Sequence, residues 1–209
     1  IASSRRFDRI APQDAIAEIQ EILPRDTIFS IDSGEHFLFA AHYLEINLPD
    51  AFVAMTGLGS MGQSIGAAIG AQLAFPARTV AAICGDGCFA MNAFEVATAA
   101  AERLPIRVFV FNDERLGMVE RGHQGIYGRR PEYSTAPLDV CTVARGLGAT
   151  ALRVDGLGQL DAARDILRMT RGPVVVDVRI DPDIAIPRQD RVAAMAPGAT
   201  RAARPKHAH

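Results

Sequence analysis

The sequence has little net charge and few cysteines, and it lacks any long apolar run. Its 22 basic and 24 acidic residues give a formal net charge of -2, which argues against a nucleic-acid binder that relies on a basic surface. Because no run of about 18 apolar residues occurs, the chain is not expected to span a membrane. The first residues, 1–9, are polar and contain no signal-peptide core.

The three cysteines are Cys84, Cys88 and Cys141. An odd number cannot form a complete disulfide framework, and no two of these stand in a CxxC pair. Unpaired cysteines are typical of a reducing compartment. Together with the polar start, they predict a cytoplasmic protein.

What the sequence does contain is an alternation of short apolar runs with longer amphipathic stretches. The apolar runs predict strands at 27–31, 52–55, 79–84, 106–111, 149–154 and 174–180. The stretches between and before them predict helices at 12–22, 37–46, 63–75, 92–103, 138–147 and 158–170. Runs such as VAAIC and IRVFVF are apolar on both faces, as parallel strands between two helix layers must be. The pattern predicts an α/β fold, a doubly wound, mostly parallel six-stranded sheet with helices on both faces.

Two segments depart from this alternation. Residues 112–137 form a connection with four glycines and two prolines, much longer than the usual strand-to-helix loop, and are predicted to be functional or disordered. Residues 188–209 carry five basic residues against one acidic, with alanine and proline between them. We therefore divide the chain into one domain, 1–187, and a basic tail, 188–209. The tail is expected either to be solvated or to pack on a partner chain or over the mouth of the site.

A candidate site begins at the end of the third predicted strand, in the run Cys84-Gly85-Asp86-Gly87-Cys88. Its two glycines allow a sharp turn and a close approach to a ligand. A helix predicted from Asn92 would point backbone N–H groups at the turn, which favours phosphate. Asp86 would repel a phosphate unless a hard cation lay between them. Taken alone, the run is also that of an ordinary strand–turn–helix in which Asp86 caps the helix.

The fourth predicted strand ends in Asn112-Asp113-Glu114-Arg115, and Asp113 follows Asp86 by 27 residues. One helix and one strand bring the chain back to the carboxyl end of a neighbouring strand. Two carboxylates there, with a backbone carbonyl and diphosphate oxygens, would complete octahedral oxygen coordination of Mg²⁺.

This spacing resembles the thiamine-diphosphate signature, GDG followed after some two dozen residues by a pair of asparagines. From about residue 9 to residue 187 the chain resembles the C-terminal diphosphate-binding (PP) domain of thiamine-diphosphate-dependent enzymes of the acetolactate synthase-like group. Three further segments carry the resemblance: Ile31-Asp32-Ser33-Gly34-Glu35-His36, Thr56-Gly57-Leu58-Gly59-Ser60-Met61-Gly62 and Leu116-Gly117-Met118-Val119.

The resemblance implies which residues bind thiamine diphosphate and Mg²⁺. Asp86 and Asp113 would ligate Mg²⁺ with the carbonyl of Arg115, and the N–H groups of Gly87 and Cys88 would face the diphosphate. The other implied cofactor-binding residues are Gly34, Glu35 and His36 beside the diphosphate, Gly59, Met61 and Met118 around the aminopyrimidine, and Gly85, Leu116 and Gly117 next to the metal site. The Gly59 carbonyl would accept from the 4′-amino group, and Met61 would wedge between the rings. On its own, a methionine at position 61 is also compatible with ordinary core packing.

Three positions depart from the family pattern. Asp113 stands where the second asparagine is usual, which adds a negative charge beside the metal. Glu35 replaces a glutamine near the diphosphate, and is expected to be protonated, turned away or paired with an arginine of the 112–137 segment. Gly122 falls where acetolactate synthases carry a pocket tryptophan, and the chain has no tryptophan. A 2-oxo acid other than that of a true acetolactate synthase is therefore expected.

The family activates its cofactor with a glutamate on a pyrimidine-binding domain, for which 209 residues leave no room. No catalytic residue is therefore assigned to this chain. The predicted function is the diphosphate-binding subunit or domain of an enzyme that decarboxylates or ligates a 2-oxo acid. It would act only with a pyrimidine-binding subunit, in a hetero-oligomer of α2β2 type, and the chain is either a separate subunit or a fragment.

The alternative function is a noncatalytic α/β nucleotide-binding or regulatory module. Residues 57–62 read as GxGxxG, the pattern of a dinucleotide-binding turn. The strand before them is short, however, and no acidic residue follows at about 20 residues, where such a site needs one.

Overall fold

In the computed structural model, residues 9–186 are described, and they contain one six-stranded parallel sheet in the order β2-β1-β3-β4-β6-β5. The strands are Ile28–Ile31 (β1), Phe52–Ala54 (β2), Val80–Gly85 (β3), Arg107–Asn112 (β4), Thr150–Val154 (β5) and Val174–Arg179 (β6). Each lies within one residue of its predicted bounds. The doubly wound α/β prediction is confirmed.

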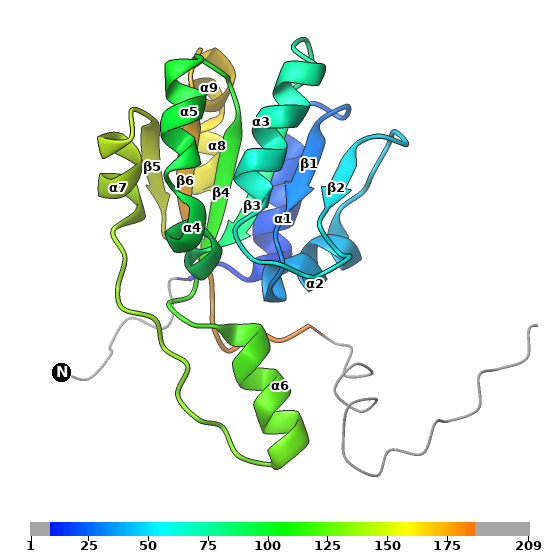
Figure 1. Ribbon diagram of the computed structural model, residues 1–209, viewed down its shortest axis with the longest axis vertical. Helices are drawn as coiled ribbons and strands as arrows, with labels where there is room; N and C mark the ends of the chain where they lie inside the picture. Colours follow the sequence, from blue (N-terminus) through cyan, green and yellow to red (C-terminus); the bar gives the residue numbers. More distant parts are fainter. Residues whose placement is uncertain (1–8, 187–209) are drawn as a thin grey trace, which may run out of the picture.

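Helices cover both faces of the sheet (Figure 1). They are Pro12–Ile22 (α1), Glu35–Tyr43 (α2), Ser64–Ala74 (α3), Asp86–Asn92 (α4), Glu95–Ala101 (α5), Gly117–Tyr127 (α6), Val140–Gly146 (α7), Gln159–Ala162 (α8) and Arg164–Met169 (α9). Helices α1, α2, α8 and α9 pack on one face, and α3, α4, α5 and α7 on the other. The two cores use alternate residues of the same strands, because successive side chains of a strand point to opposite faces.

The sheet reverses its direction of winding between β1 and β3. The chain leaves β1 through α2 to reach β2 on one side, then returns through α3 to place β3 on the other side. Ligands of open parallel sheets bind at such a switch point, beyond the carboxyl ends of the strands. The end of β1 and the GDG run at the end of β3 meet there.

The structure corrects the prediction of a helix over 92–103. Helix α4 begins at Asp86, inside the run read as a turn, and α5 continues from Glu95. The glycine at 87 serves close packing rather than a turn, since a Cβ there would lie 2.9 Å from Leu116 Cδ2 and 3.3 Å from Met61 Cε. Sequence patterns cannot separate these two uses of glycine.

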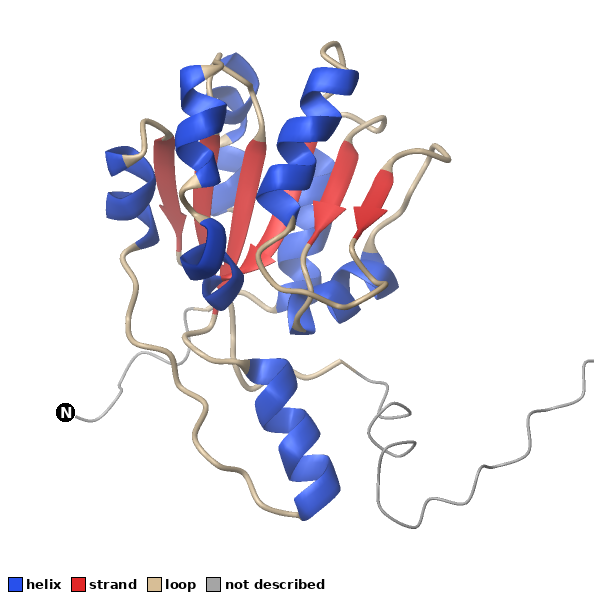
Figure 2. Cartoon of the chain, viewed as in Figure 1, coloured by secondary structure: helices blue, strands red, loops and turns tan. Residues whose placement is uncertain are grey.

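Of the two predictions for the long segment 112–137, disorder is corrected, because the segment contains the eleven-residue helix α6. This helix lies beyond the carboxyl edge of the sheet, outside both helix layers (Figure 2). It ends at Gly128, whose φ of +67° is the left-handed conformation that favours glycine after a helix. The four glycines masked a helix whose one buried side chain is Glu120.

One further predicted helix, 158–170, is divided into α8 and α9. The N–H of Ala163 donates to the carbonyl of Leu160, a bond between residues three apart that tightens the chain at the junction. The predicted basic tail, 188–209, lies outside the described residues, so its packing stays a prediction.

Asp32 connects the end of β1 to the start of α3. Its buried carboxylate accepts from the Gln63 N–H at 2.9 Å, the Ser64 N–H at 3.3 Å and the Ser64 hydroxyl at 3.0 Å. Helix α3 has no capping side chain of its own, so this contact satisfies its first N–H groups from across the fold.

Replacing Asp32 with alanine is therefore expected to lower the free energy of unfolding by about 1–3 kcal/mol, because it leaves the buried N–H and hydroxyl of Ser64 and the partly buried N–H of Gln63 without their acceptor. Urea denaturation followed by circular dichroism measures the change. An unchanged unfolding midpoint in Asp32→Ala would contradict this role.

Candidate functional site

A cavity of about 260 Å³ opens at the carboxyl ends of β1, β3 and β4. Every residue that the sequence assigned to cofactor or metal lines it: Gly34, Glu35, His36, Gly59, Met61, Gly85, Asp86, Gly87, Cys88, Asp113, Arg115, Leu116, Gly117 and Met118. Segments that are far apart in the sequence thus meet at one place.

Asp86 and Asp113 come from neighbouring strands. Strands β3 and β4 are parallel and in register, with Gly85 opposite Phe111, so both carboxylates emerge at the same edge. Burial raises the pKa of Asp86, while burial and then the charge of Asp86 raise the pKa of Asp113 to about 7. Among the described residues neither carboxylate has an ion-pair partner. Two repelling carboxylates withdrawn from water form a place that favours a cation.

This pair needs further ligands to hold a metal ion. The described part of the chain has no cluster of three or more histidine, cysteine, aspartate or glutamate side chains suited to a metal. Oxygen ligands beyond the two carboxylates would have to come from the backbone and from a bound ligand. A hard cation with several oxygen ligands, such as Mg²⁺, fits that donor set.

Thr135 holds one of the two carboxylates in place. Its hydroxyl donates to Asp86 Oδ2 at 2.8 Å. The segment that carries it returns to the site by pairing with the end of β4, through Leu116 N–H to Tyr133 O and Thr135 N–H to Glu114 O, both 2.9 Å. The far end of the long segment is therefore part of the site.

A neutral histidine forms the floor of the cavity. His36 is buried, and burial lowers its pKa to about 4. A Cβ on Gly34 would lie 2.3 Å from the ring, and one on Gly85 would lie 3.1 Å from it, so both glycines are needed for the ring to fit. The Cys88 thiol donates to the carbonyl of Ser33 at 3.2 Å, and burial raises its pKa to about 12.

Met61 and Leu116 cover the first turn of α4. Both side chains lie against Gly87, as the distances to a Cβ at that position show. Met61 also packs on the core cluster beneath α3 and α4. Met61 therefore both packs on the core and lines the cavity.

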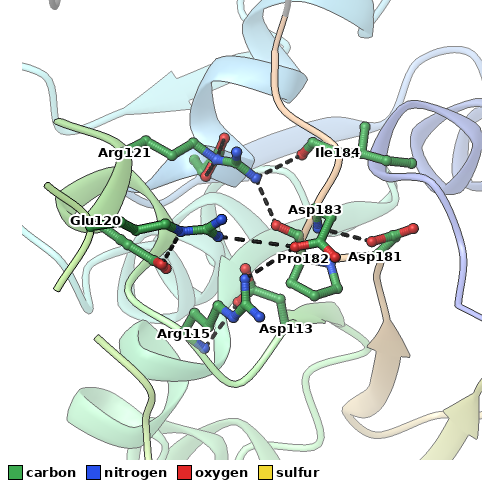
Figure 3. A network of polar contacts seen from close by, with 10 residues as sticks. Asp113, Arg115, Glu120, Arg121, Asp181, Pro182, Asp183 and Ile184 are labelled. Atoms are coloured by element: carbon green, nitrogen blue, oxygen red, sulfur yellow. Dashed lines mark hydrogen bonds and ion pairs between the residues drawn. The ribbon is translucent and has the colours of Figure 1, made fainter. Parts of the chain in front are cut away.

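Glu35 is paired with an arginine, one of the three arrangements that the sequence left open. Arg121 Nε lies 2.7 Å from one carboxylate oxygen of Glu35 and 2.9 Å from the other. Arg121 Nη2 also donates to the carbonyls of Pro182 and Ile184 at 2.7 and 3.1 Å. Figure 3 shows this arginine between α6 and the segment after β6.

Two other arginines, Arg115 and Arg130, belong to the same network, and Figure 3 labels the first of them. Arg115 Nη1 lies 3.4 Å from Asp183 Oδ1. Arg130 pairs with Glu120 and lies 4.0 Å from Asp183. These contacts fasten α6 and the segment after β6 to each other beside the cavity.

Comparison with known proteins identifies the family. Residues 32–178 match the family described as "Thiamine pyrophosphate enzyme, C-terminal TPP binding domain". The chain belongs to this thiamine pyrophosphate enzyme family. The resemblance read from the motifs is thereby confirmed, and the domain is one that binds thiamine diphosphate.

Relatives of this TPP-binding domain include acetolactate synthases. The chain is 34% identical to acetolactate synthase 1, chloroplastic, of Zea mays over 199 residues, which cover 91% of this chain and 30% of that protein. It is also 34% identical to the acetolactate synthase isozyme 2 large subunit of Escherichia coli (strain K12), over 85% of this chain and 34% of that protein. The chain thus spans about a third of the length of the relatives it matches.

Sequence reasoning missed Thr135 and left open which arginine of the long segment pairs with Glu35. Nothing near Thr135 marks it as a neighbour of Asp86, from which it is 49 residues distant. Arg121 was one of several arginines in the long segment, and its pairing with Glu35 spans 86 residues.

None of the helices within residues 9–186 has the length and the apolar character that a membrane span requires.

If Asp86 ligates Mg²⁺ as the resemblance implies, replacing Thr135 with alanine is expected to weaken Mg²⁺ binding roughly 10- to 100-fold, the usual effect of losing a group that orients a metal ligand. Titration of Mg²⁺ at saturating thiamine diphosphate measures it. Thr135→Ser, which keeps the hydroxyl, is the matched control and should bind nearly as the parent does. Equal affinity in Thr135→Ala would show that Asp86 needs no orientation.

Proposed function

We propose that this TPP-binding domain serves an enzyme that acts on a 2-oxo acid, by decarboxylation, carboligation or both. The observation that carries the proposal is the pair of carboxylates at the ends of β3 and β4, in a cavity lined by every residue that the sequence assigned to cofactor or metal. The acetolactate synthases among the relatives support the same class of substrate.

Asp86 and Asp113 are the proposed Mg²⁺ ligands, with the backbone carbonyl of Arg115 as the third ligand from this chain. Diphosphate oxygens would fill further positions. The cation would compensate two buried carboxylates, since burial raises the pKa of both and the charge of Asp86 adds to the rise at Asp113. Asp113 in place of the usual asparagine gives the site one more negative charge toward the metal.

The rest of the cavity is proposed to hold thiamine diphosphate in three parts. The N–H groups of Gly87 and Cys88 would face the diphosphate, and Gly34, Glu35 and His36 would lie on its other side. Leu116 and Gly117 would lie next to the metal. Gly59, Met61 and Met118 would surround the aminopyrimidine. When bound, thiamine diphosphate supplies the carbon nucleophile for the 2-oxo acid. The chain's own residues place the cofactor and keep water from it.

We further propose that a pyrimidine-binding subunit completes the enzyme, in a hetero-oligomer of α2β2 type located in the cytoplasm. The proposal rests on the family resemblance, in which the activating glutamate lies on a pyrimidine-binding domain. The three cysteines, all buried and unpaired, fit a reducing compartment. If the 209 residues are instead part of a longer chain, the same pyrimidine-binding part would lie elsewhere in that chain.

Calorimetry tests the proposal directly. Thiamine diphosphate is titrated into the assembled enzyme with Mg²⁺ and with EDTA, and we expect binding that depends on the metal. Nuclear magnetic resonance of ¹³C-labelled pyruvate and its longer homologues then identifies the product. Binding of a nucleotide instead of thiamine diphosphate would favour the noncatalytic module.

A further inference from the structure

The cavity places a carboxylate where an anion is proposed to bind. Glu35 lines the cavity together with Asp86 and Asp113, and the ring of His36 is neutral because burial lowers its pKa to about 4. A Cβ on Gly117 would lie 2.6 Å from Glu35 Oε2 and 3.4 Å from Asp113 Oδ2, so these two carboxylates converge on one point. A diphosphate bound there meets like charge.

Arg121 supplies the opposite charge to Glu35. Its Nε contacts both carboxylate oxygens, and 13% of the Glu35 side chain and 26% of the Arg121 side chain are exposed, so the pair is only partly screened by water. Burial raises the pKa of Glu35, and the charge of Arg121 opposes the rise.

The position of Arg121 is fixed from a second side. Its Nη2 donates to two backbone carbonyls, those of Pro182 and Ile184, in the segment after β6. The other arginines of the network are directed to different acceptors, Arg115 to Asp183 and Arg130 to Glu120 and Asp183. Arg121 is thus the arginine of this network that is paired with Glu35.

We propose that Arg121 is a positioning residue that neutralises Glu35, so that the diphosphate of the cofactor can bind beside a carboxylate. The inference rests on the proposed cofactor site. It assigns the residue to charge compensation rather than to contact with the substrate. Removing the glutamate charge should then make the arginine dispensable.

Five variants of the assembled enzyme test this: Arg121→Gln, Arg121→Lys, Glu35→Gln, the double variant Glu35→Gln/Arg121→Gln, and Arg129→Gln. Arg129 is exposed in the same segment and its loss removes the same charge away from the cavity. Affinity for thiamine diphosphate at saturating Mg²⁺ is measured by calorimetry, and melting temperature without cofactor reports folding.

Arg121→Gln is expected to weaken binding roughly 10- to 100-fold, within the range that contacting charged residues show in mutant cycles. Arg121→Lys should keep most of the affinity, and Arg129→Gln all of it. The double variant should bind within about threefold of Glu35→Gln, since no uncompensated carboxylate remains.

Three results would overturn the inference. Unchanged affinity in Arg121→Gln would remove any role in binding. A double variant as weak as Arg121→Gln would assign the arginine to holding α6 rather than to charge. If Arg121→Gln does not fold, loss of affinity in a folded Arg121→Lys variant or in a folded double variant would likewise overturn the assignment to charge compensation. Absence of binding in the parent enzyme would instead refute the proposed function itself.

Discussion

Replacing Asp86 with alanine is expected to abolish metal-dependent binding of thiamine diphosphate, with a loss of more than about 100-fold. Loss of a group that only orients a metal ligand costs up to about 100-fold, and loss of the ligand costs more. Asp86 is buried at the start of α4 and shares the proposed cation with Asp113. Calorimetric titration of thiamine diphosphate with Mg²⁺ into the assembled enzyme measures the effect.

Asp50→Ala is the matched control for this experiment. Asp50 is exposed and lies just before the amino end of β2, whereas the cavity lies at the carboxyl ends of the strands. Its loss should therefore leave the affinity for thiamine diphosphate unchanged. Melting temperatures of both variants separate loss of binding from loss of the fold. Affinity in Asp86→Ala equal to that of the parent would remove Asp86 from the metal site.

The second large effect concerns the glutamate that activates the cofactor. This chain without a pyrimidine-binding part is expected to turn over no 2-oxo acid. Glu35 is the glutamate that lines the cavity in the described part of the chain, and Arg121 holds it beside the proposed diphosphate. Proton transfer at the pyrimidine ring therefore lacks its acid, and general acid–base participation is worth roughly 10²- to 10⁴-fold.

Two further glutamates near the cavity are also held in ion pairs. Glu114 pairs with Arg179 at 2.6 Å, and Glu120 pairs with Arg130. Turnover should appear when a pyrimidine-binding part is added and should be lost again when its glutamate is changed to glutamine. Turnover by the 209-residue chain alone, with mass spectrometry detecting no other protein, would contradict the partner requirement.

Local patterns were sufficient for the sheet and insufficient for the segments beside the site. Strands such as β3 and β4 are apolar on both faces, a property that burial between two helix layers requires and that a sequence displays directly. Helices α4 and α6 were misread because glycine marks turns in most contexts. Here Gly87 allows Leu116 and Met61 to approach, which depends on residues far along the chain.

The site divides in the same way. Asp86 and Asp113 were predicted to meet because one helix and one strand between them lead to the neighbouring strand end, a consequence of parallel topology alone. The amino-acid sequence by itself determined the family, the sheet and the motif residues that line the cavity, since these follow from hydrophobic periodicity and short motifs. The tertiary structure decided that Thr135 donates to Asp86 and that Arg121 pairs with Glu35. Both contacts depend on how the long segment 112–137 folds back over the site, and that fold is set by packing rather than by local sequence pattern.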